Sequence, residues 1–495
     1  MPKPGGAAVE CLMDLPLALT FDDVLLVPQE SDVLPTEVVT ATRFSRNVPL
    51  NVPVASAAMD TVTESRLAIA LAQQGGIGVI HRNLPVEEQV REVDIVKRSA
   101  HGVIGDPLTL SPEDTIRDAR RIMEEHHISG LPVLEGDRLV GILTRRDLKF
   151  QGRDEQKVHQ VMTRNLVTAP EGTSLDQAKA ILFEAKVEKL PLVDDQGRLV
   201  GLITMRDIRL DEEFPQAARD EDGCLVCGAA IGVHDYERAE ALVEAGVDVL
   251  VVDTAHGHSA GVIDTVRELK RRDWVDVVAG NVATTEGAEA LIEAGADGVK
   301  VGIGPGSICT TRVVAGVGVP QFTAVYQVSQ VCNAEDVPVV ADGGIRHSGD
   351  AVKALGAGAG SVMLGSLLAG VDESPGETFL YRGRTFKAVR GMGSLAAMVE
   401  GGKARYGQGG VAESSKLVPE GVEGMVPHRG PLAPFVYQFV GGIRAGMGYL
   451  GADTLEVFRA RARFVRITGA GVAESHPHDV RVTREAPNYW GGNGE

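Results

Sequence analysis

The sequence predicts an α/β protein whose core is a closed (β/α)8 (TIM) barrel. Eight short apolar runs each end in glycine or a polar cluster, and helical patterns lie between them. Continuous apolar strands that alternate with helices indicate a parallel sheet buried on both faces. The count of eight, with no strong dinucleotide-binding fingerprint, favours closure into a barrel. The predicted strands lie in 51–60, 76–83, 224–233, 248–257, 276–284, 298–307, 338–345 and 361–370.

The barrel pattern is divided between two parts of the chain. Residues 1–99 hold an N-terminal segment and the first two βα units, with helical patterns at 65–76 and 86–98. Residues 216–495 hold the remaining units and a long C-terminal portion. The block between them, 100–215, does not follow the βα pattern and is predicted to be a separate inserted module.

The inserted block contains an internal repeat. Its copies span about 106–148 and 164–208, and each has a Pro-x-x-Thr/Ser helix start, a Leu-Pro strand, a turn and a Leu-Val-Gly-Ile/Leu-x-Thr-x-Arg-Asp ending. Ser or Thr before a helix is a typical N-cap. The repeat resembles a tandem pair of cystathionine-β-synthase-type (CBS) domains, which implies a module that binds nucleotides such as ATP, GTP or GDP; a purely structural insertion is the alternative. In that family, ribose and phosphate are held at the positions of Thr144, Asp147, Thr204 and Asp207.

About 125 residues follow the last predicted barrel strand, and they fit no further βα unit. The segment 391–430 is rich in glycine and polar residues and has few long apolar runs. A loop of this length in a compact enzyme is usually functional, often as a mobile lid. We therefore expect a long active-site flap at about 384–430, starting from the C-terminal face of the barrel, where active sites of this fold lie.

Composition and charge limit the possible partners and the compartment. The chain of 495 residues carries a formal net charge of −19, which disfavours non-specific binding of nucleic acid because the overall field repels phosphate. No apolar run is long enough to cross a bilayer, and residues 1–13 lack the pattern of a signal peptide. The five cysteines form an odd, sparse set that does not suit a disulfide framework. These observations predict a cytoplasmic protein that binds neither membranes nor specific nucleic acid.

The strongest local signal for chemistry is GIGPGSICTTR, residues 302–312, directly after the sixth predicted strand. Its alternate glycines allow the backbone to approach a ligand closely, and Ser307 with nearby N–H groups is suited to a phosphate. Cys309 is expected in the barrel mouth, and a thiol is the most nucleophilic of the ordinary side chains. The alternative for a lone cysteine, a small buried hydrophobe, suits Cys11 and Cys332 better.

Two more glycine turns follow the last two predicted strands, ADGGI at 341–345 and MLGS at 363–366. Loops at these places in a (β/α)8 barrel commonly bind phosphate, and Asp342 is an acceptor suited to a ribose diol; tight turns without a ligand are the alternative. GAGAGS at 356–361 lacks the spacing of a dinucleotide fingerprint. The C-x-x-C at 224–227 lies inside a predicted strand, where its sulfurs would point to opposite faces, so a redox or metal role is not expected.

Several long motifs occur in order along almost the whole chain. They are LTFDDVLLVP (19–28), MDTVTESRLAIALAQQGGIGVIHRN (59–83), GSICTTR (306–312), ADGGI (341–345), RGMGSL (390–395), ARYGQ (404–408), VPEGVEG (418–424) and ESHPHDVRVTREAPNY (474–489). Together these motifs resemble the IMP dehydrogenases, most closely those of bacteria. The resemblance implies oxidation of IMP to XMP with NAD+, by a homotetramer or an octamer that also binds a monovalent cation, usually K+.

The resemblance also implies a covalent mechanism. Cys309 would add to C2 of hypoxanthine, hydride would leave C2 for the nicotinamide, and the thioimidate would be hydrolysed after the flap moves into the vacated dinucleotide site. Arg405 and Tyr406 correspond to the flap pair that activates the water, and Thr311 to a threonine that helps position it. An arginine base is unusual, because its free pKa is above about 12. Orientation of a hydroxide-like water, transient deprotonation beside Tyr406 and simple anion binding all stay open.

Three sets of ligand contacts follow from the same resemblance. Backbone groups of the RGMG turn, with Glu420, would read the hypoxanthine edge. The IMP contacts fall on Ser307, Asp342, Gly343, Gly344, Gly365, Ser366, Val389, Arg390, Gly391, Met392, Gly393 and Glu420. The dinucleotide contacts fall on Asp253, Asn281, Gly302, Ile303 and Gly304. Carbonyls, which replace the hydration shell of K+, would come from Gly304, Gly306 and Cys309, completed by Glu474, Ser475 and His476 of a neighbouring subunit, in a C-terminal segment at about 470–489.

Two positions depart from the family pattern. Val389 stands where a tyrosine hydroxyl usually binds the phosphate, and losing one charge-assisted hydrogen bond costs about 1.5–3 kcal/mol. Gly407 stands where an aromatic residue usually follows the flap pair, which would loosen flap docking. The rival functions are a GMP reductase, whose typical members lack the inserted pair and the Arg-Tyr flap, and a nucleotide-sensing protein with an inactive barrel. The intact Cys309, Thr311 and flap pair favour the dehydrogenase.

Overall fold

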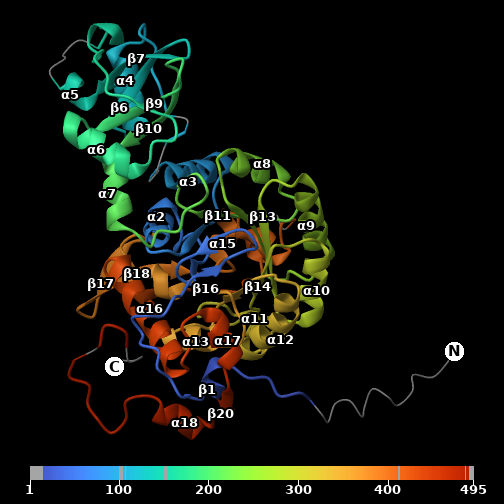
Figure 1. The fold of residues 1–495 in the computed structure, drawn as a ribbon. Coiled ribbons are helices and arrows are strands. Elements are labelled where there is room, and N and C mark those ends of the chain that lie inside the picture. The colour runs from blue at the N-terminus through green and yellow to red at the C-terminus, as the bar shows by residue number, and fades with distance from the viewer. Residues whose placement is uncertain are drawn as a thin grey trace. The chain divides into compact units, whose positions relative to one another are not determined.

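The computed structural model describes residues 15–99, 104–105, 107–126, 128–149, 154–410, 413–484 and 486–489 (Figure 1). Contacts between residues divide the chain into two compact units. The larger comprises Met1–Val93 and Val226–Glu495, and the smaller comprises Asp94–Leu225. Each unit has hydrophobic side chains buried within it.

Eight parallel strands form a closed barrel in the larger unit, which confirms the predicted fold class. Around the barrel, β4 and β5 close the ring between β16 and β11. Every residue of these strands is buried except Asp342, because side chains face either the barrel interior or the surrounding helices. The strands are β4 (Val54–Ser56), β5 (Ile77–Ile80), β11 (Cys227–Ile231), β12 (Val249–Asp253), β13 (Asp276–Val282), β14 (Gly298–Val301), β15 (Val339–Asp342) and β16 (Ser361–Leu364).

Helices follow the strands and cover the outside of the barrel (Figure 1). The helical patterns predicted at 65–76 and 86–98 are confirmed by α2 and α3. Thr284 caps α10, because its hydroxyl accepts a hydrogen bond from the N–H of Gly287 at 3.3 Å. The helices are α2 (Ser65–Gln73), α3 (Val86–Ser99), α8 (Tyr236–Glu244), α9 (Ala260–Arg272), α10 (Thr285–Glu293), α12 (Gln321–Ala334) and α13 (Ser348–Gly356).

As predicted, no further βα unit follows the last barrel strand, β16, but the helix that completes the unit of β16 was not predicted. The short helix α14 (Ser366–Ala369) follows β16, and after a long excursion α16 (Leu432–Tyr449) packs against α13 and α2. It buries a face with helical spacing that includes Leu432, Phe435 and Phe439. The eighth helix is therefore present, but a flap separates it from its strand. Although α16 is long and apolar, no helix in the described part of the chain meets the requirements of a membrane span.

The excursion before α16 has regular structure at both ends. β17 (Thr378–Tyr381), β18 (Arg384–Arg390) and β19 (Glu423–Pro427) form an antiparallel sheet. The flap predicted at 384–430 thus begins and ends on two paired strands, and is not an irregular loop throughout. Between them lie α15 (Leu395–Glu400), η3 (Gly402–Tyr406) and η4 (Ser414–Lys416).

Segments near the two ends of the larger unit lie beside each other. β1 (Val24–Leu26) pairs antiparallel with β20 (Phe464–Arg466), and the ring of Phe464 meets that of Phe322 edge-on at 4.8 Å. The remaining short elements are η1 (Phe21–Asp23), β2 (Thr42–Arg43), β3 (Pro49–Leu50), α11 (Thr311–Val314), α17 (Leu455–Arg461) and α18 (Gly469–Glu474).

The smaller unit repeats one arrangement of helix, two strands and helix, each copy with its own hydrophobic core. The predicted helix starts are confirmed: Thr115 accepts from the N–H of Asp118, and Ser174 accepts from the N–H of Gln177. The first copy comprises α4 (Ile116–Glu125), β6 (Gly130–Glu135), β7 (Arg138–Thr144) and α5 (Arg145–Leu148), followed by η2 (Val158–Gln160). The second comprises β8 (Ala169–Pro170), α6 (Leu175–Ala185), β9 (Lys189–Val193), β10 (Leu199–Thr204) and α7 (Met205–Glu213).

Candidate active site

The cysteine-containing loop follows the C-terminal end of β14, in the mouth of the barrel. A cavity of about 130 Å³ opens there. Loops after several barrel strands line it together with the flap. The predicted site residues among its lining are Asn281, Gly302, Ile303, Gly304, Gly306, Cys309, Thr311, Asp342, Gly343, Gly391, Met392, Arg405, Tyr406 and Glu420.

The loop that carries Cys309 is paired with the returning end of the flap. The N–H of Thr310 donates to the carbonyl of Glu420 at 2.9 Å, and Cys309 forms a β-bridge with Gly421. The Sγ of Cys309 lies 3.2 Å from Oγ1 of Thr311. The thiol is therefore held beside a hydroxyl group, on a backbone that the flap supports.

The predicted purine-reading turn rests on the same end of the flap. The N–H of Gly391 donates to the carbonyl of Val422, and the N–H of Glu420 donates to the carbonyl of Gly393, both at 3.0 Å. Val422 also donates to the carbonyl of Ile308 at 3.0 Å. The turn, the flap end and the cysteine loop are thus joined by backbone hydrogen bonds, which keeps Glu420 next to the cavity.

The flap pair lies inside the cavity. The guanidinium of Arg405 makes an ion pair with Asp253. The backbone carbonyl of Arg405 accepts a hydrogen bond from the N–H of Ala255 at 3.2 Å. Tyr406 packs on Gly393, where a Cβ would lie 2.6 Å from the tyrosine ring. Burial lowers the pKa of Arg405, whereas the neighbouring phenol of Tyr406 and the contact with Asp253 favour its charged form. Burial also raises the pKa of Tyr406.

A buried lysine that sequence reasoning missed joins the predicted dinucleotide and IMP contacts. Lys300 on β14 is 1% exposed. Its Nζ lies 3.0 Å from Oδ1 of Asp253 and 2.7 Å from Oδ2 of Asp342, and it also contacts Oδ1 of Asn281. The sequence could have identified Lys300, because it is a single charged residue within an otherwise apolar strand. Such a residue is almost never fully buried unless it is paired with opposite charges.

The glycine turns pack against each other through their backbones. A Cβ on Gly302 would lie 2.1 Å from the carbonyl oxygen of Asp342, and the φ of Gly302 is +149°. Gly343 and Gly344 also have positive φ, at +94° and +77°. No other residue type fits Gly302 without displacing a barrel loop.

Two serines from neighbouring turns meet at this end of the barrel. The hydroxyls of Ser307 and Ser366 lie 3.2 Å apart, and Gly365 precedes the short helix α14. Free N–H groups at a helix start and paired hydroxyls are donors suited to phosphate oxygens. The predicted phosphate contacts are thus brought together by the loops after β14 and β16.

Both departures from the family pattern have a defined structural setting. Val389 is 2% exposed and lies in β18 opposite Gly424, so it contributes packing and no hydroxyl. Gly407 ends η3 with a φ of +69°, a conformation that favours glycine over an aromatic residue.

The predicted cation ligands fall into two groups. Gly304, Gly306 and Cys309 line the cavity. The side-chain contacts of Ser475 and His476 include Gly471, Tyr489 and His347, and Glu474 ends α18. The carbonyl of Gly306 accepts the N–H of Cys309 at 3.1 Å and keeps a second lone pair. The described residues include no cluster of three or more His, Cys, Asp or Glu side chains able to hold a metal ion.

The other cysteines have surroundings that differ from those of Cys309. Burial raises the pKa of Cys332 to about 12, as suits a small hydrophobe. Cys227 begins β11 and is buried, whereas Cys224 lies before the strand; the prediction that both lie within the strand is wrong for Cys224. Neither forms a disulfide with another described cysteine, and Cys11 lies outside the described residues.

Comparisons with known proteins agree with this geometry. A family model described as the IMP dehydrogenase / GMP reductase domain matches residues 18–478. Inosine-5'-monophosphate dehydrogenases of Rhodopirellula baltica, Aquifex aeolicus and Bacillus subtilis are 57%, 57% and 55% identical to this chain, over 96%, 95% and 95% of it and 88%, 97% and 97% of their own lengths.

A solved structure of a GMP reductase variant from Trypanosoma brucei, in complex with guanosine 5'-monophosphate, is also similar. Its TM-score is 0.85 and its identity 44%, and the match covers 95% of this chain and 99% of that chain. Because a GMP reductase matches nearly the full length, the presence of an inserted block does not by itself separate the two activities.

Proposed function

The chain belongs to the IMP dehydrogenase / GMP reductase family, and from this we infer that it oxidises IMP to XMP with reduction of NAD+ to NADH. The observation that carries this function is the identity of 55–57% to inosine-5'-monophosphate dehydrogenases over nearly the full chain, against 44% to the GMP reductase. The pair Arg405 and Tyr406 inside the cavity agrees with a reaction that ends in hydrolysis.

The deciding experiment follows NADH formation from IMP and NAD+ in K+ buffer. We expect turnover with IMP and no NADPH-dependent release of ammonia from GMP. Ammonia release without NADH formation would instead assign the chain to the reductases, and inactivity in both assays would favour a nucleotide-sensing protein.

We propose Cys309 as the nucleophile. Its thiolate adds to C2 of the hypoxanthine ring, and the hydride on C2 then departs, which leaves a thioimidate. When bound, the nicotinamide supplies the acceptor for that hydride. Water then adds to C2, the C–S bond breaks, and XMP and the thiol are released. The contact of Sγ with Thr311 supports this role, because a hydroxyl beside the sulfur would lie close to the carbon that water attacks.

The flap pair is proposed to activate that water. Arg405 contacts Asp253, which the family resemblance assigns to the dinucleotide. One carboxylate would therefore serve the dinucleotide during hydride transfer and the flap arginine during hydrolysis, so the two occupants exclude each other. Tyr406 beside the guanidinium provides a second group through which a proton from water can be shared.

Substrate positioning is assigned to the turns. Ser307, Ser366 and the N–H groups of neighbouring glycines would hold the phosphate, and Asp342 would accept from the ribose diol. Lys300 offsets the repulsion between Asp342 and Asp253, which face it from two sides. The purine contacts are proposed at Gly391, Met392, Gly393 and Glu420, with the remaining IMP contacts at Gly343, Gly344, Gly365, Val389 and Arg390.

A monovalent cation and a homotetramer belong together in this proposal. The carbonyls of Gly304, Gly306 and Cys309 would provide half of the cation shell, and Glu474 to His476 of a neighbouring subunit would complete it. Replacement of K+ by Li+ should lower turnover, while gel filtration with light scattering should give a tetramer or an octamer.

We propose that the smaller unit is a CBS pair that senses nucleotides. Two clefts within it support this, one lined by Arg145, Lys189 and Thr204, the other by Thr144 and Asp147. Titration of ATP, GTP and GDP against the intact enzyme tests the assignment. A cytoplasmic location is proposed because no disulfide joins any two of the described cysteines.

A further inference from the structure

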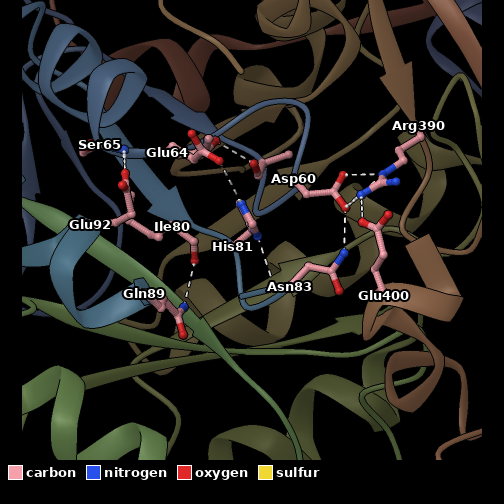
Figure 2. A network of polar contacts seen from close by, with 12 residues as sticks. Asp60, Glu64, Ser65, Ile80, His81, Asn83, Gln89, Glu92, Arg390 and Glu400 are labelled. Carbon is pink, nitrogen blue, oxygen red and sulfur yellow. Dashed lines mark hydrogen bonds and ion pairs between the residues drawn. The ribbon is translucent and has the colours of Figure 1, made fainter. Parts of the chain in front are cut away.

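Polar contacts join the start of the flap to two barrel loops, beside the purine-reading turn (Figure 2). Asp60 lies in the loop after β4, Asn83 in the loop after β5, Arg390 at the end of β18 and Glu400 at the end of α15. We propose that these four residues form a clamp that positions the purine-reading turn and the flap pair together. The inference rests on the proposed function, because it assigns roles within that reaction.

The ion pair between Asp60 and Arg390 is the centre of the clamp. Nε of Arg390 lies 3.2 and 3.1 Å from the two carboxylate oxygens, and Nη2 lies 2.7 Å from Oδ2. The N–H of Arg390 also donates to Oγ1 of Thr61 at 3.2 Å. The Asp60 side chain is 7% exposed and that of Arg390 is 22% exposed. Water therefore screens this pair less than a surface pair, and its charge-assisted bonds are correspondingly stronger.

Asn83 ties the second barrel loop to the same carboxylate. Its Nδ2 donates to Oδ2 of Asp60 at 2.7 Å, and its own N–H donates to Nδ1 of the buried His81 at 3.1 Å. A Cβ on Gly401 would lie 2.6 Å from Oδ1 of Asn83. The flap backbone at Gly401, just after α15, therefore packs directly against the Asn83 side chain.

Glu400 extends the clamp to the flap. Its carboxylate contacts Nη2 of Arg390, so one guanidinium lies between two carboxylates, and the Asp60 and Glu400 hydrogen bonds both raise the pKa of Arg390. Arg390 and Glu400 bound the stretch that contains the purine-reading turn, and η3 with the flap pair starts at Gly402. Movement of Arg390 would consequently displace both parts of the site.

A role in positioning differs from a role in stability alone by its effect on the two chemical steps. Residues that only stabilise the fold would change the melting temperature and leave the ratio of hydride transfer to hydrolysis unchanged. Residues that position the flap would alter that ratio, because only hydrolysis needs the flap pair in the cavity. The ratio is measured as the pre-steady-state NADH burst against the steady-state rate.

The first test is Glu400→Gln, with Glu413→Gln as the matched control. Glu413 is a flap carboxylate of similar exposure that pairs with Lys416. Glu400→Gln should keep the burst rate and slow the steady state about 2- to 5-fold, as expected for one partly exposed charge contact. Hydrogen exchange of peptide 395–408 without nucleotide should also rise. The control should change neither quantity.

The second test is Asp60→Asn, which should raise the KM for IMP about 10- to 100-fold through displacement of the turn. Arg390→Lys should retain more activity than Arg390→Gln but less than the wild type, because an ammonium cannot engage both carboxylates in the same geometry. In the Arg390→Gln background, Glu400→Gln should add no further loss if Glu400 acts through Arg390.

The outcomes separate the clamp from the proposed function. If the wild type forms no NADH from IMP, the function itself fails. If the wild type is active while Glu400→Gln matches Glu413→Gln in both rates and in exchange, the clamp is wrong. Equal loss of burst and steady state in Glu400→Gln would also overturn it. Should Asp60→Asn fail to fold, the Glu400 and Arg390 variants still decide the question.

Discussion

The glycine turns after β14 and β15 and the flap between β18 and β19 face the same cysteine but are held by different contacts. The turns pack backbone against backbone, as at Gly302, where no side chain fits. The flap is held by its paired strands and by polar side chains, including Arg405 on Asp253 and Arg390 on Asp60. A site held by backbone packing stays in place through a cycle, whereas side-chain contacts can be exchanged for a ligand. The glycine turns thus form a fixed part of the proposed substrate site, whereas the flap is the part whose contacts can be replaced by a ligand.

Removal of the thiol that both regions face should give the largest effect. Cys309→Ala should lower kcat by about 10⁴-fold or more, because the nucleophile forms the covalent bond. IMP binding by calorimetry should persist, since the turns are untouched. A normal NADH burst in this variant would refute the nucleophile assignment.

Arg405→Ala tests the flap alone. Hydrolysis should slow by about 10³-fold, within the range for loss of a general acid–base group, while the NADH burst keeps its rate and the covalent adduct accumulates. Intact-mass spectrometry of the quenched enzyme measures that adduct. Parallel loss of burst and steady state would mean that Arg405 chiefly binds substrate.

Gly302→Ala tests the turns. The added methyl group would meet the carbonyl of Asp342, so we expect destabilisation by about 3 kcal/mol, measured by urea unfolding. The rates of hydride transfer and of hydrolysis should fall by the same factor, because the substrate-binding turns themselves are displaced. Gly316→Ala is the matched control, as Gly316 also has a positive φ, +72°, but has nothing within 4 Å of its Cβ position. A selective loss of hydrolysis in Gly302→Ala would contradict the comparison.

Gly407→Ala should give the smallest effect. The position has a φ of +69° and open space around it, so the cost is the left-handed backbone alone, about 1 kcal/mol. Since that cost falls on the docked flap, hydrolysis should slow about 5-fold while hydride transfer is unchanged. Gly407→Asn, which tolerates this conformation better, should lie closer to the wild type. An equal effect of both substitutions would exclude backbone conformation as the cause.

Sequence alone predicted the parts of the fold that depend on local pattern. The eight barrel strands were predicted because each is a continuous apolar run. The helix caps at Thr115 and Ser174 were predicted because a hydroxyl before a helix accepts a hydrogen bond from a backbone N–H of the first turn. The loop of Cys309 was found for the same reason: glycines and a thiol after a strand are informative by themselves.

Features that depend on distant contacts were not predicted. α16 was missed as the eighth barrel helix because the flap separates it from β16. Lys300 was missed because its partners, Asp253 and Asp342, lie on other strands. Arg390 was assigned to IMP by resemblance, while its pairing with Asp60 emerges only when the end of β18 meets the loop after β4. Pairing across the barrel is a property of the closed sheet, not of any short window of sequence.

The β-bridge between Cys309 and Gly421 affects the effective concentration of the Arg405 side chain at the active site. β18 and β19 pair where this segment begins and ends, and the bridge at Gly421 lies just before β19, so the segment that carries Arg405 is anchored at both ends. A tether of this kind keeps the Arg405 side chain at an effective concentration on the order of millimolar. A guanidinium compound added to an Arg405→Ala enzyme would have to exceed that concentration to replace the side chain.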